Sequence, residues 1–290
     1  MNKILTFFII LYLELRRKVM GVKYFAEIDV TDNCNLRCGH CYHFNGKQEF
    51  VKEELPFKIW KERLDNLYQE GVRFLLLVGG EPALREDVLM YANELFPMIY
   101  VITNGTIVIP KEFNHLLFVS IDGSEERNDM IRGRGIFSKV MKNYSGDNRV
   151  AINMTITKEN YKDLEGVVKL ARENGFRGVV CNICSSGTDV EVPMFLKRSD
   201  REIIIEELKR VKRLYPRDFI LSDRMIKWYE YADHRGFCHW GDEVLHFDVS
   251  WKKRRCFGNN ADCSNCGCFA GAIQNPMVLI FSPFEAIRLM

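Results

Sequence analysis

Short apolar runs and longer amphipathic segments follow one another along the first two thirds of the chain. The short runs are rich in Val, Ile, Leu and Phe, which is typical of strands buried on both faces of a parallel sheet. In the longer segments apolar residues recur at helical spacing, as in 54–70, which ends before Gly71. The pattern predicts strands at 24–30, 72–78, 99–102, 116–121, 150–157 and 178–183, and helices at 54–70, 87–96, 125–144, 161–174 and 200–214.

This alternation predicts an α/β fold in which six parallel strands are joined by right-handed helical crossovers. The alternation stops beyond Pro216, so we expect one domain over 24–215 and a small Cys-rich module over 216–290. Within that module, 244–251 alternates between apolar and polar residues and predicts a hairpin strand.

The N-terminal segment 1–23 contains an apolar run at 4–13, followed by Arg16, Arg17 and Lys18. Ten residues are too few to span a bilayer, and basic residues after the apolar run are in the wrong order for a signal peptide. Three interpretations remain: a helix packed on the domain, a helix lying on a membrane surface, or a true start at Met20. Since 277–290 is also apolar, the two terminal segments either pack together or form a membrane-facing patch or a hydrophobic entrance to the site.

Composition narrows the function classes. Lys and Arg are interspersed with Asp and Glu, and the net charge over 290 residues is +2, so nothing favours a nucleic-acid partner. Ten cysteines without a convincing secretory leader point to thiolate ligation in a reducing compartment rather than to disulfides. The sequence therefore predicts a cytoplasmic metal-binding protein.

Three cysteines lie directly after the first predicted strand, at Cys34, Cys38 and Cys41. A structural zinc site is normally closed by four ligands, whereas the next cysteine is Cys181. Three thiolates suit a four-iron cluster that leaves one iron open to a substrate. A zinc knuckle completed by His40 or a distant ligand, and buried free thiols, are the alternatives.

This stretch resembles the CxxxCxφC motif of the radical S-adenosylmethionine (radical SAM) superfamily, with His40 where an aromatic residue is more common. The resemblance implies a partial (β/α)6 TIM-like barrel with a small Cys-rich C-terminal extension. It also implies that Cys34, Cys38 and Cys41 hold a [4Fe-4S] cluster whose open iron binds SAM, and that His40 lies against the adenine. Electron transfer from a flavodoxin- or ferredoxin-type reductant would then cleave SAM to a 5′-deoxyadenosyl radical.

Further segments resemble SAM-binding positions of the same family. Gly79, Gly80, Glu81 and Pro82 follow the second predicted strand and look like the GGE motif that binds the amino group of SAM. The two glycines would let the backbone approach a ligand closely.

Polar residues after the next strands complete the implied SAM site. Asn104 follows the third strand, and by the resemblance Ser120 and Arg132 reach the methionyl carboxylate or the ribose of SAM. Asn153 on the fifth strand is implied to reach the ribose. Asp122 either belongs to the segment after the fourth strand that resembles one in the family or is only the cap of the next turn.

The C-terminal module carries a second set of cysteines, Cys256, Cys263, Cys266 and Cys268. Four thiols in this span favour a metal site, and either tetrahedral zinc or an iron–sulfur cluster satisfies them. The set resembles a shortened SPASM or twitch module, which implies an auxiliary iron–sulfur cluster. The full SPASM pattern has seven cysteines, and here Cys238 alone is left to replace a member of the set.

Cys181 and Cys184 form a different kind of pair. Residues i and i+3 of an extended strand point to opposite faces, so we expect buried thiols or pocket lining rather than a shared metal.

These features predict a radical SAM enzyme acting on an unreactive carbon of an unidentified substrate. The apolar terminal segments favour a hydrophobic small molecule or lipid. The alternatives are a peptide- or protein-modifying maturase and a non-enzymatic iron–sulfur or zinc electron-transfer protein. No residue is singled out as the catalytic acid, base or radical-quenching group.

Overall fold

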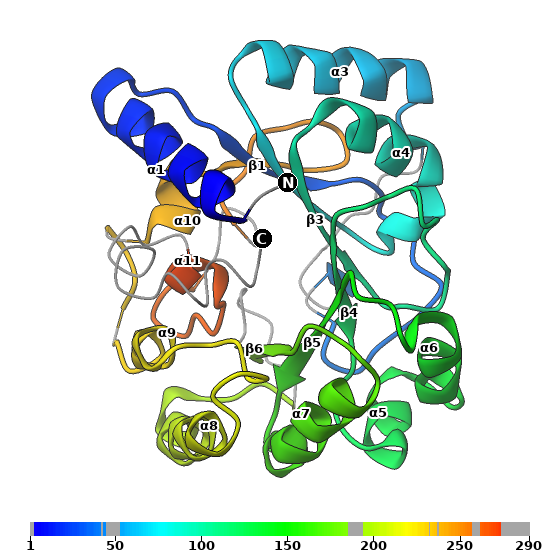
Figure 1. Cartoon of the computed structure of the whole chain (residues 1–290), viewed down its shortest axis with the longest axis vertical. Coiled ribbons are helices and arrows are strands. Elements are labelled where there is room, and N and C mark those ends of the chain that lie inside the picture. Colours follow the sequence, from blue (N-terminus) through cyan, green and yellow to red (C-terminus); the bar gives the residue numbers. More distant parts are fainter. Residues whose placement is uncertain are drawn as a thin grey trace.

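The computed structural model describes residues 3–41, 43–44, 53–184, 194–231, 233–236, 238–256 and 262–273. The described residues form a parallel seven-stranded sheet in the order β6-β5-β4-β3-β2-β1-β7. The strands curve around the centre of the molecule and the helices lie outside them (Figure 1). The strands are β1 (Phe25–Asp29), β2 (Phe74–Val78), β3 (Met98–Thr103), β4 (Leu116–Ser120), β5 (Val150–Ile156), β6 (Val179–Ile183) and β7 (Leu245–Phe247).

Helices follow the strands as the apolar spacing predicts. They are α1 (Lys3–Met20), α3 (Phe57–Gln69), α4 (Glu86–Leu95), α5 (Glu125–Arg132), α6 (Ile136–Tyr144), α7 (Leu164–Glu173), α8 (Arg201–Leu214), α9 (Asp223–Trp228), α10 (His239–Glu243) and α11 (Ala270–Ile273), with 3-10 turns η1 (Pro82–Arg85), η2 (Tyr161–Asp163) and η3 (Arg198–Asp200).

Burial explains why the apolar runs become strands. Every residue of β1, β2 and β4 is buried, which matches strands covered on one face by helices and on the other by the barrel interior. Each fully buried Leu, Val or Ile stabilises the fold by about 1.5–3 kcal/mol relative to exposure. The six predicted strands are confirmed.

Local sequence explains where two helices depart from the prediction. The region 125–144 is two helices rather than one, because Gly133 and Gly135 adopt positive φ angles of 121° and 77° between them. The helix predicted from 54 begins at Phe57, since Pro56 occupies its N-cap.

The strand predicted at 244–251 as part of a hairpin has a different principal partner. β7 pairs in parallel with β1 and so extends the barrel sheet by a seventh strand. A short antiparallel turn also follows β7: Phe247 bridges to Lys253, the Arg254 amide donates to the His246 carbonyl at 3.0 Å, and the Asp248 amide donates to the Lys252 carbonyl at 3.0 Å. Sequence alternation marks a strand but does not specify which neighbour it joins.

The segment after β7 also reaches the opposite edge of the sheet. The Ile183 amide donates to the Gly267 carbonyl at 2.9 Å, and the Phe269 amide donates to the side chain of Asn182 at 2.9 Å. β7, which pairs with β1, is one edge of the sheet, and β6 is the other. The second set of cysteines therefore lies between these two edges. The predicted boundary between 215 and 216 stays a prediction.

The N-terminal segment forms α1, which contacts the rest of the molecule through the buried Leu13 and an ion pair between Arg17 and Glu243 of α10. Its exposed face carries an apolar stripe at Phe8, Leu11, Tyr12, Leu15 and Val19. Within the described residues, no helix combines the length and apolar character needed to cross a membrane. Membrane contact and the start at Met20 stay predictions, and 277–290 lies outside the described residues.

Candidate functional site

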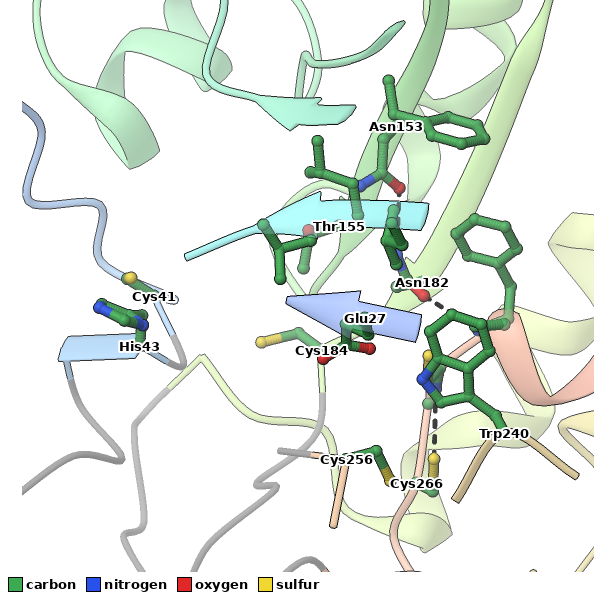
Figure 2. Close-up of a pocket in the computed structure, with 18 of the residues that line it drawn as sticks. Glu27, Cys41, His43, Asn153, Thr155, Asn182, Cys184, Trp240, Cys256 and Cys266 are labelled. Atoms are coloured by element: carbon green, nitrogen blue, oxygen red, sulfur yellow. Dashed lines mark hydrogen bonds between the residues drawn. The ribbon is translucent and has the colours of Figure 1, made fainter. Parts of the chain in front are cut away.

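One cavity of about 270 Å³ connects the two sets of cysteines. It extends from the barrel interior, at Phe25 of β1 and Tyr100 of β3, to the carboxyl ends of the strands, where parallel α/β folds place their ligands. Figure 2 shows Cys41 and His43 on one side of this cavity, Cys256 and Cys266 on another, and Cys184 and Glu27 between them. Its lining includes all seven cysteines predicted as metal ligands, namely Cys34, Cys38, Cys41, Cys256, Cys263, Cys266 and Cys268, and also Cys238.

The loop that carries the first cysteines is held by the turn after β2. A Cβ atom on Gly80 would lie 2.1 Å from the Asn33 carbonyl oxygen, and one on Gly79 would lie 2.4 Å from that of Thr31. The Gly80 amide donates to the Thr31 carbonyl at 2.7 Å. Both glycines line the cavity, but the close approach that requires them in this structure is to the protein's own loop before Cys34.

Glu81 supports this turn from behind the cavity. Its fully buried carboxylate accepts hydrogen bonds from Thr103 Oγ1 at 2.6 Å and from the Asn104 amide at 2.7 Å, and burial raises its pKa. Neither Glu81 nor Pro82 is among the described residues that line the cavity. Glu81 thereby ties the turn after β2 to the turn after β3.

Asn104 reaches the first cysteines directly. Its side-chain amide donates to Asn35 Oδ1 at 2.9 Å and lies 3.7 Å from Cys34 Sγ. Such N–H donors stabilise a thiolate or an iron–sulfur cluster and raise its reduction potential.

A buried charged group lies beside Cys38. His40 Nε2 and Arg132 Nε lie 2.6 and 2.7 Å from Asp122 Oδ2, and Arg132 Nη1 lies 3.9 Å from Cys38 Sγ. Burial acts to raise the pKa of Asp122, but Arg132 and His40 outweigh it and hold that pKa well below its ordinary value. Burial also raises the pKa of the Cys38 thiol to about 11, and Arg132 opposes this shift.

The structure gives Asp122 a role other than a cap. Ser124, not Asp122, caps α5, by accepting a hydrogen bond from the Arg127 amide. His40 and Arg132 line the cavity and Asp122 lies behind them, so these three residues, which are far apart in sequence, converge at the strand ends.

A row of polar side chains crosses the inner face of β4, β5 and β6. Ser120 is the sheet partner of Asn153, and Thr155 is the partner of Asn182. The Asn182 side chain donates to Asn153 Oδ1 at 3.1 Å (Figure 2). Sequence reasoning named Ser120 and Asn153 but missed Thr155 and Asn182, although the alternation of β5 and β6 puts them on the same face.

Most other cavity residues are apolar or aromatic. The Phe, Tyr and Trp rings come from β1, β3 and β4, from the segment before α8 and from the C-terminal segment: Phe25, Tyr100, Phe118, Phe195, Trp240 and Phe269.

Long-range contacts hold the second set of cysteines. Arg254 Nη2 lies 3.0 Å from Glu27 Oε1 and 2.9 Å from Asp29 Oδ1 on β1. Arg201 of α8 donates to the Cys266 carbonyl at 2.9 Å. Gly267 packs so closely on β6 that a Cβ would lie 2.0 Å from the Ile183 carbonyl oxygen.

The donor chemistry fits iron–sulfur clusters. Within the described part of the chain, no three or more His, Cys, Asp or Glu side chains are placed to hold a single metal ion. The three thiols of Cys34, Cys38 and Cys41 nevertheless open into one cavity, beside the cation of Arg132 and the amide of Asn104. Thiols with nearby N–H donors are the surroundings that such clusters use.

Cys181 and Cys184 do not share a site. Both are buried, Cys184 lines the cavity and Cys181 does not, and the Cys181 carbonyl accepts a hydrogen bond from Tyr229. Burial raises the pKa of the Cys184 thiol to about 12, so it is protonated at neutral pH. The expected opposite orientation of the two side chains is confirmed.

A sequence profile described as the radical SAM superfamily matches residues 28–191, more than half of the chain. The chain belongs to the radical SAM superfamily. Members of this superfamily are enzymes that use a [4Fe-4S] cluster and SAM, so the predicted family, fold class and principal cofactors are confirmed.

Individual radical SAM proteins are similar to parts of this chain. The Fe-coproporphyrin III synthase of Methanosarcina barkeri is 31% identical over 160 residues, covering 50% of this chain and 40% of that protein. The sporulation killing factor maturation protein SkfB of Bacillus subtilis is 32% identical over 165 residues, covering 52% and 40%. The matched part of the chain thus spans well under half the length of either relative.

A solved structure shares the fold over a longer stretch. The structure of Streptococcus suis SuiB bound to the precursor peptide SuiA has a TM-score of 0.62 and 16% sequence identity, and covers 85% of this chain and 66% of that one. At this identity the likeness shows the partial barrel fold.

Proposed function

We propose that this chain is a radical SAM enzyme that modifies a peptide or protein, with its SAM cluster held by Cys34, Cys38 and Cys41. The observation that carries the proposal is the single cavity joining this set of thiols to the second set. A substrate that enters it lies within reach of both. The substrate class follows from the cavity lining and from the similar proteins.

A [4Fe-4S] cluster and SAM held here would supply radical chemistry able to remove a hydrogen atom from an unreactive carbon of the substrate. The chain's own residues would orient SAM: the turn at Gly79 and Gly80 would hold its amino group, and Ser120 and Arg132 would hold its carboxylate or ribose. Asn153 would hold the ribose, and His40 the adenine. Glu81 and Pro82 act by shaping the turn, because they lie behind the cavity.

We assign the second set of cysteines to an auxiliary iron–sulfur cluster, with Cys256, Cys263, Cys266 and Cys268 as ligands and Cys238 close by. All five line the same cavity, and burial raises the pKa of the Cys266 thiol to about 11. Metal binding stabilises the thiolate form and so offsets the free energy needed to deprotonate the buried thiol. Zinc is the competing occupant.

The polar row favours a peptide over the hydrophobic or lipid substrate predicted from the terminal segments. The Thr155 hydroxyl lies on the cavity wall, where a lipid chain would cover it without offering a hydrogen bond. A peptide backbone offers both donors and acceptors. The similarity to SuiB, whose structure contains a precursor peptide, supports the same class.

Two further features of the proposal concern the electron donor and the division of the chain into domains. A one-electron donor of the flavodoxin or ferredoxin class supplies the cluster. Residues 24–215 form the SAM-binding barrel and 216–290 the auxiliary module, with β7 and the segment around Gly267 joining them.

The test uses perdeuterated substrates. Anaerobically reconstituted protein is incubated with SAM and a flavodoxin reducing system, and with either a tryptic digest of perdeuterated cell protein or vesicles of perdeuterated phospholipid. Deuterium in the 5′-deoxyadenosine, measured by mass spectrometry, reports which substrate lost a hydrogen atom. We expect label from the peptide digest and none from the vesicles.

Protein lacking Cys34, Cys38 and Cys41 is the control and should form no 5′-deoxyadenosine. Deuterium from the lipid vesicles alone would show that the substrate is a hydrophobic molecule rather than a peptide. Label from perdeuterated coproporphyrin III but from neither of the others would favour tetrapyrrole chemistry, as the name of the Methanosarcina relative suggests.

A further inference from the structure

Asp122 is a firmly anchored charged group near the first cysteines. Its side chain is fully buried, and its Oδ1 accepts a hydrogen bond from the Thr155 amide at 2.8 Å. Its own amide donates to Asn128 Oδ1 at 3.0 Å, and its carbonyl accepts from Asn160 at 2.9 Å. With its backbone fixed on both sides, the carboxylate has little freedom to move.

Oδ2 of this fixed carboxylate lies between two residues of the cavity wall. It is 2.6 Å from His40 Nε2 and 2.7 Å from Arg132 Nε, and both partners are buried. His40 belongs to the cysteine loop and Arg132 ends α5. Asp122 thus determines where both side chains lie, without lining the cavity itself.

Arg132 connects this group to the cluster site, since its Nη1 lies 3.9 Å from Cys38 Sγ. A cation beside an iron–sulfur cluster stabilises the reduced form, which carries one more negative charge, and so raises the reduction potential. A cluster that must transfer an electron to SAM needs a low potential. Without a compensating negative charge, Arg132 would raise the reduction potential of the cluster.

We propose that Asp122 is a positioning residue that compensates the charge of Arg132 and so keeps the SAM cluster at a low reduction potential. The inference rests on the proposed assignment of Cys34, Cys38 and Cys41 as the ligands of that cluster. It gives Asp122 and Arg132 opposite effects: removing the carboxylate raises the potential, and removing the guanidinium lowers it. Residues that act only by packing would not have effects of opposite sign.

The experiment measures the midpoint potential of the reconstituted full-length protein by redox titration followed by electron paramagnetic resonance. The response to SAM identifies the signal of the relevant cluster in the wild type, and the same signal is then titrated without SAM in each variant, because Arg132 is itself assigned to SAM binding. We expect Asp122→Asn to shift its potential upward, by about a tenfold change in the reduction equilibrium, which is 59 mV for one electron. Arg132→Gln should shift it downward, and Asp122→Asn should slow 5′-deoxyadenosine formation.

Asp147→Asn is the matched control. Asp147 is also a buried carboxylate, 2.7 Å from the buried Arg149, but neither residue is among the described residues that line the cavity. This variant should leave the potential unchanged. If Asp122→Asn fails to assemble its cluster, the downward shift in Arg132→Gln alone decides.

An unchanged potential in both variants, or shifts of the same sign, would overturn the proposal while leaving the proposed function intact. If instead the wild-type protein shows no SAM-responsive signal, the ligand assignment itself is wrong.

Discussion

The two sets of cysteines are held in place in different ways. The first set lies on one loop directly after β1, and the turns that follow β2, β3 and β4 support it through Gly80, Asn104 and Asp122. The second set follows β7 and is held at both sides of the sheet. Arg254 contacts a carboxylate of β1, and Gly267 packs against β6. The first site is therefore a product of the barrel itself, whereas the second exists only once distant segments have come together.

This difference changes which substitutions matter. Around the first set, several neighbouring turns share the support, so the loss of one contact leaves others. Around the second set, the contacts that the structure describes come from segments far apart in the sequence, such as Arg254 with β1, Gly267 with β6 and Arg201 of α8 with Cys266. We expect the second site to be lost through substitutions outside its cysteines more readily than the first.

The largest effect should come from removing the first set of thiols. Replacing Cys34, Cys38 and Cys41 together by Ala should abolish 5′-deoxyadenosine formation and halve the iron content, because the second set retains its metal. Iron analysis and chromatography of the SAM products measure both. The reciprocal variant, with Ala at the four C-terminal positions, should keep its SAM-responsive signal. SAM cleavage by the triple variant would contradict the assignment.

Replacement of Arg254 should have the next largest effect. Arg254→Met leaves the buried carboxylates of Glu27 and Asp29 without their shared cation, which should cost about 3 kcal/mol of unfolding free energy. Urea denaturation measures this, and metal content should fall at the second set only. As a control, Arg235→Gln removes a solvent-exposed pair with Asp233 and should leave the unfolding free energy nearly unchanged. Equal losses in the two variants would show that Arg254 is not a special anchor.

A methyl group at Gly267 should have a somewhat smaller effect on stability. Gly267→Ala places a Cβ against the Ile183 carbonyl, so the segment must move away from β6 at a cost of about 1–3 kcal/mol. We expect lower metal occupancy at the second set and normal occupancy at the first. Gly166→Ala within α7 meets no atom within 4 Å and should be neutral or stabilising by about 0.5–1 kcal/mol. If Gly267→Ala keeps full metal occupancy at the second set and unchanged thermal stability, the close packing on β6 does not hold that set in place.

The smallest effect concerns pH. Burial acts to raise the pKa of Glu27, but His246 and Arg254 lower it from 4.5 to about 2. Because the folded-state pKa is depressed, the stabilisation is present above pH 4.5 and is lost as the pH falls toward 2. From pH 7 to pH 4 the metal-free wild type should lose about 1 kcal/mol more than Glu27→Gln, as measured by urea denaturation. If the two proteins lose the same unfolding free energy between pH 7 and pH 4, Glu27 has an ordinary pKa in the folded protein.

Much of the barrel could be predicted from the sequence. A strand buried on both faces must be apolar throughout, as in β2, and a helix against the sheet must repeat its apolar positions, as in α8, so both leave local patterns. The spacing of Cys34, Cys38 and Cys41 is similarly local, because one loop carries all three. These features required no knowledge of which segments meet.

Tertiary structure alone determined how these parts fit together. Residues 244–251 alternate in sequence, but only packing decided that β7 joins β1 in parallel. Asp122 meets His40 across 82 positions, and Arg254 meets Glu27 across 227, distances over which sequence patterns carry no contact information. A buried charge is recognised by the partners that compensate it, and those partners are known only when the chain has folded.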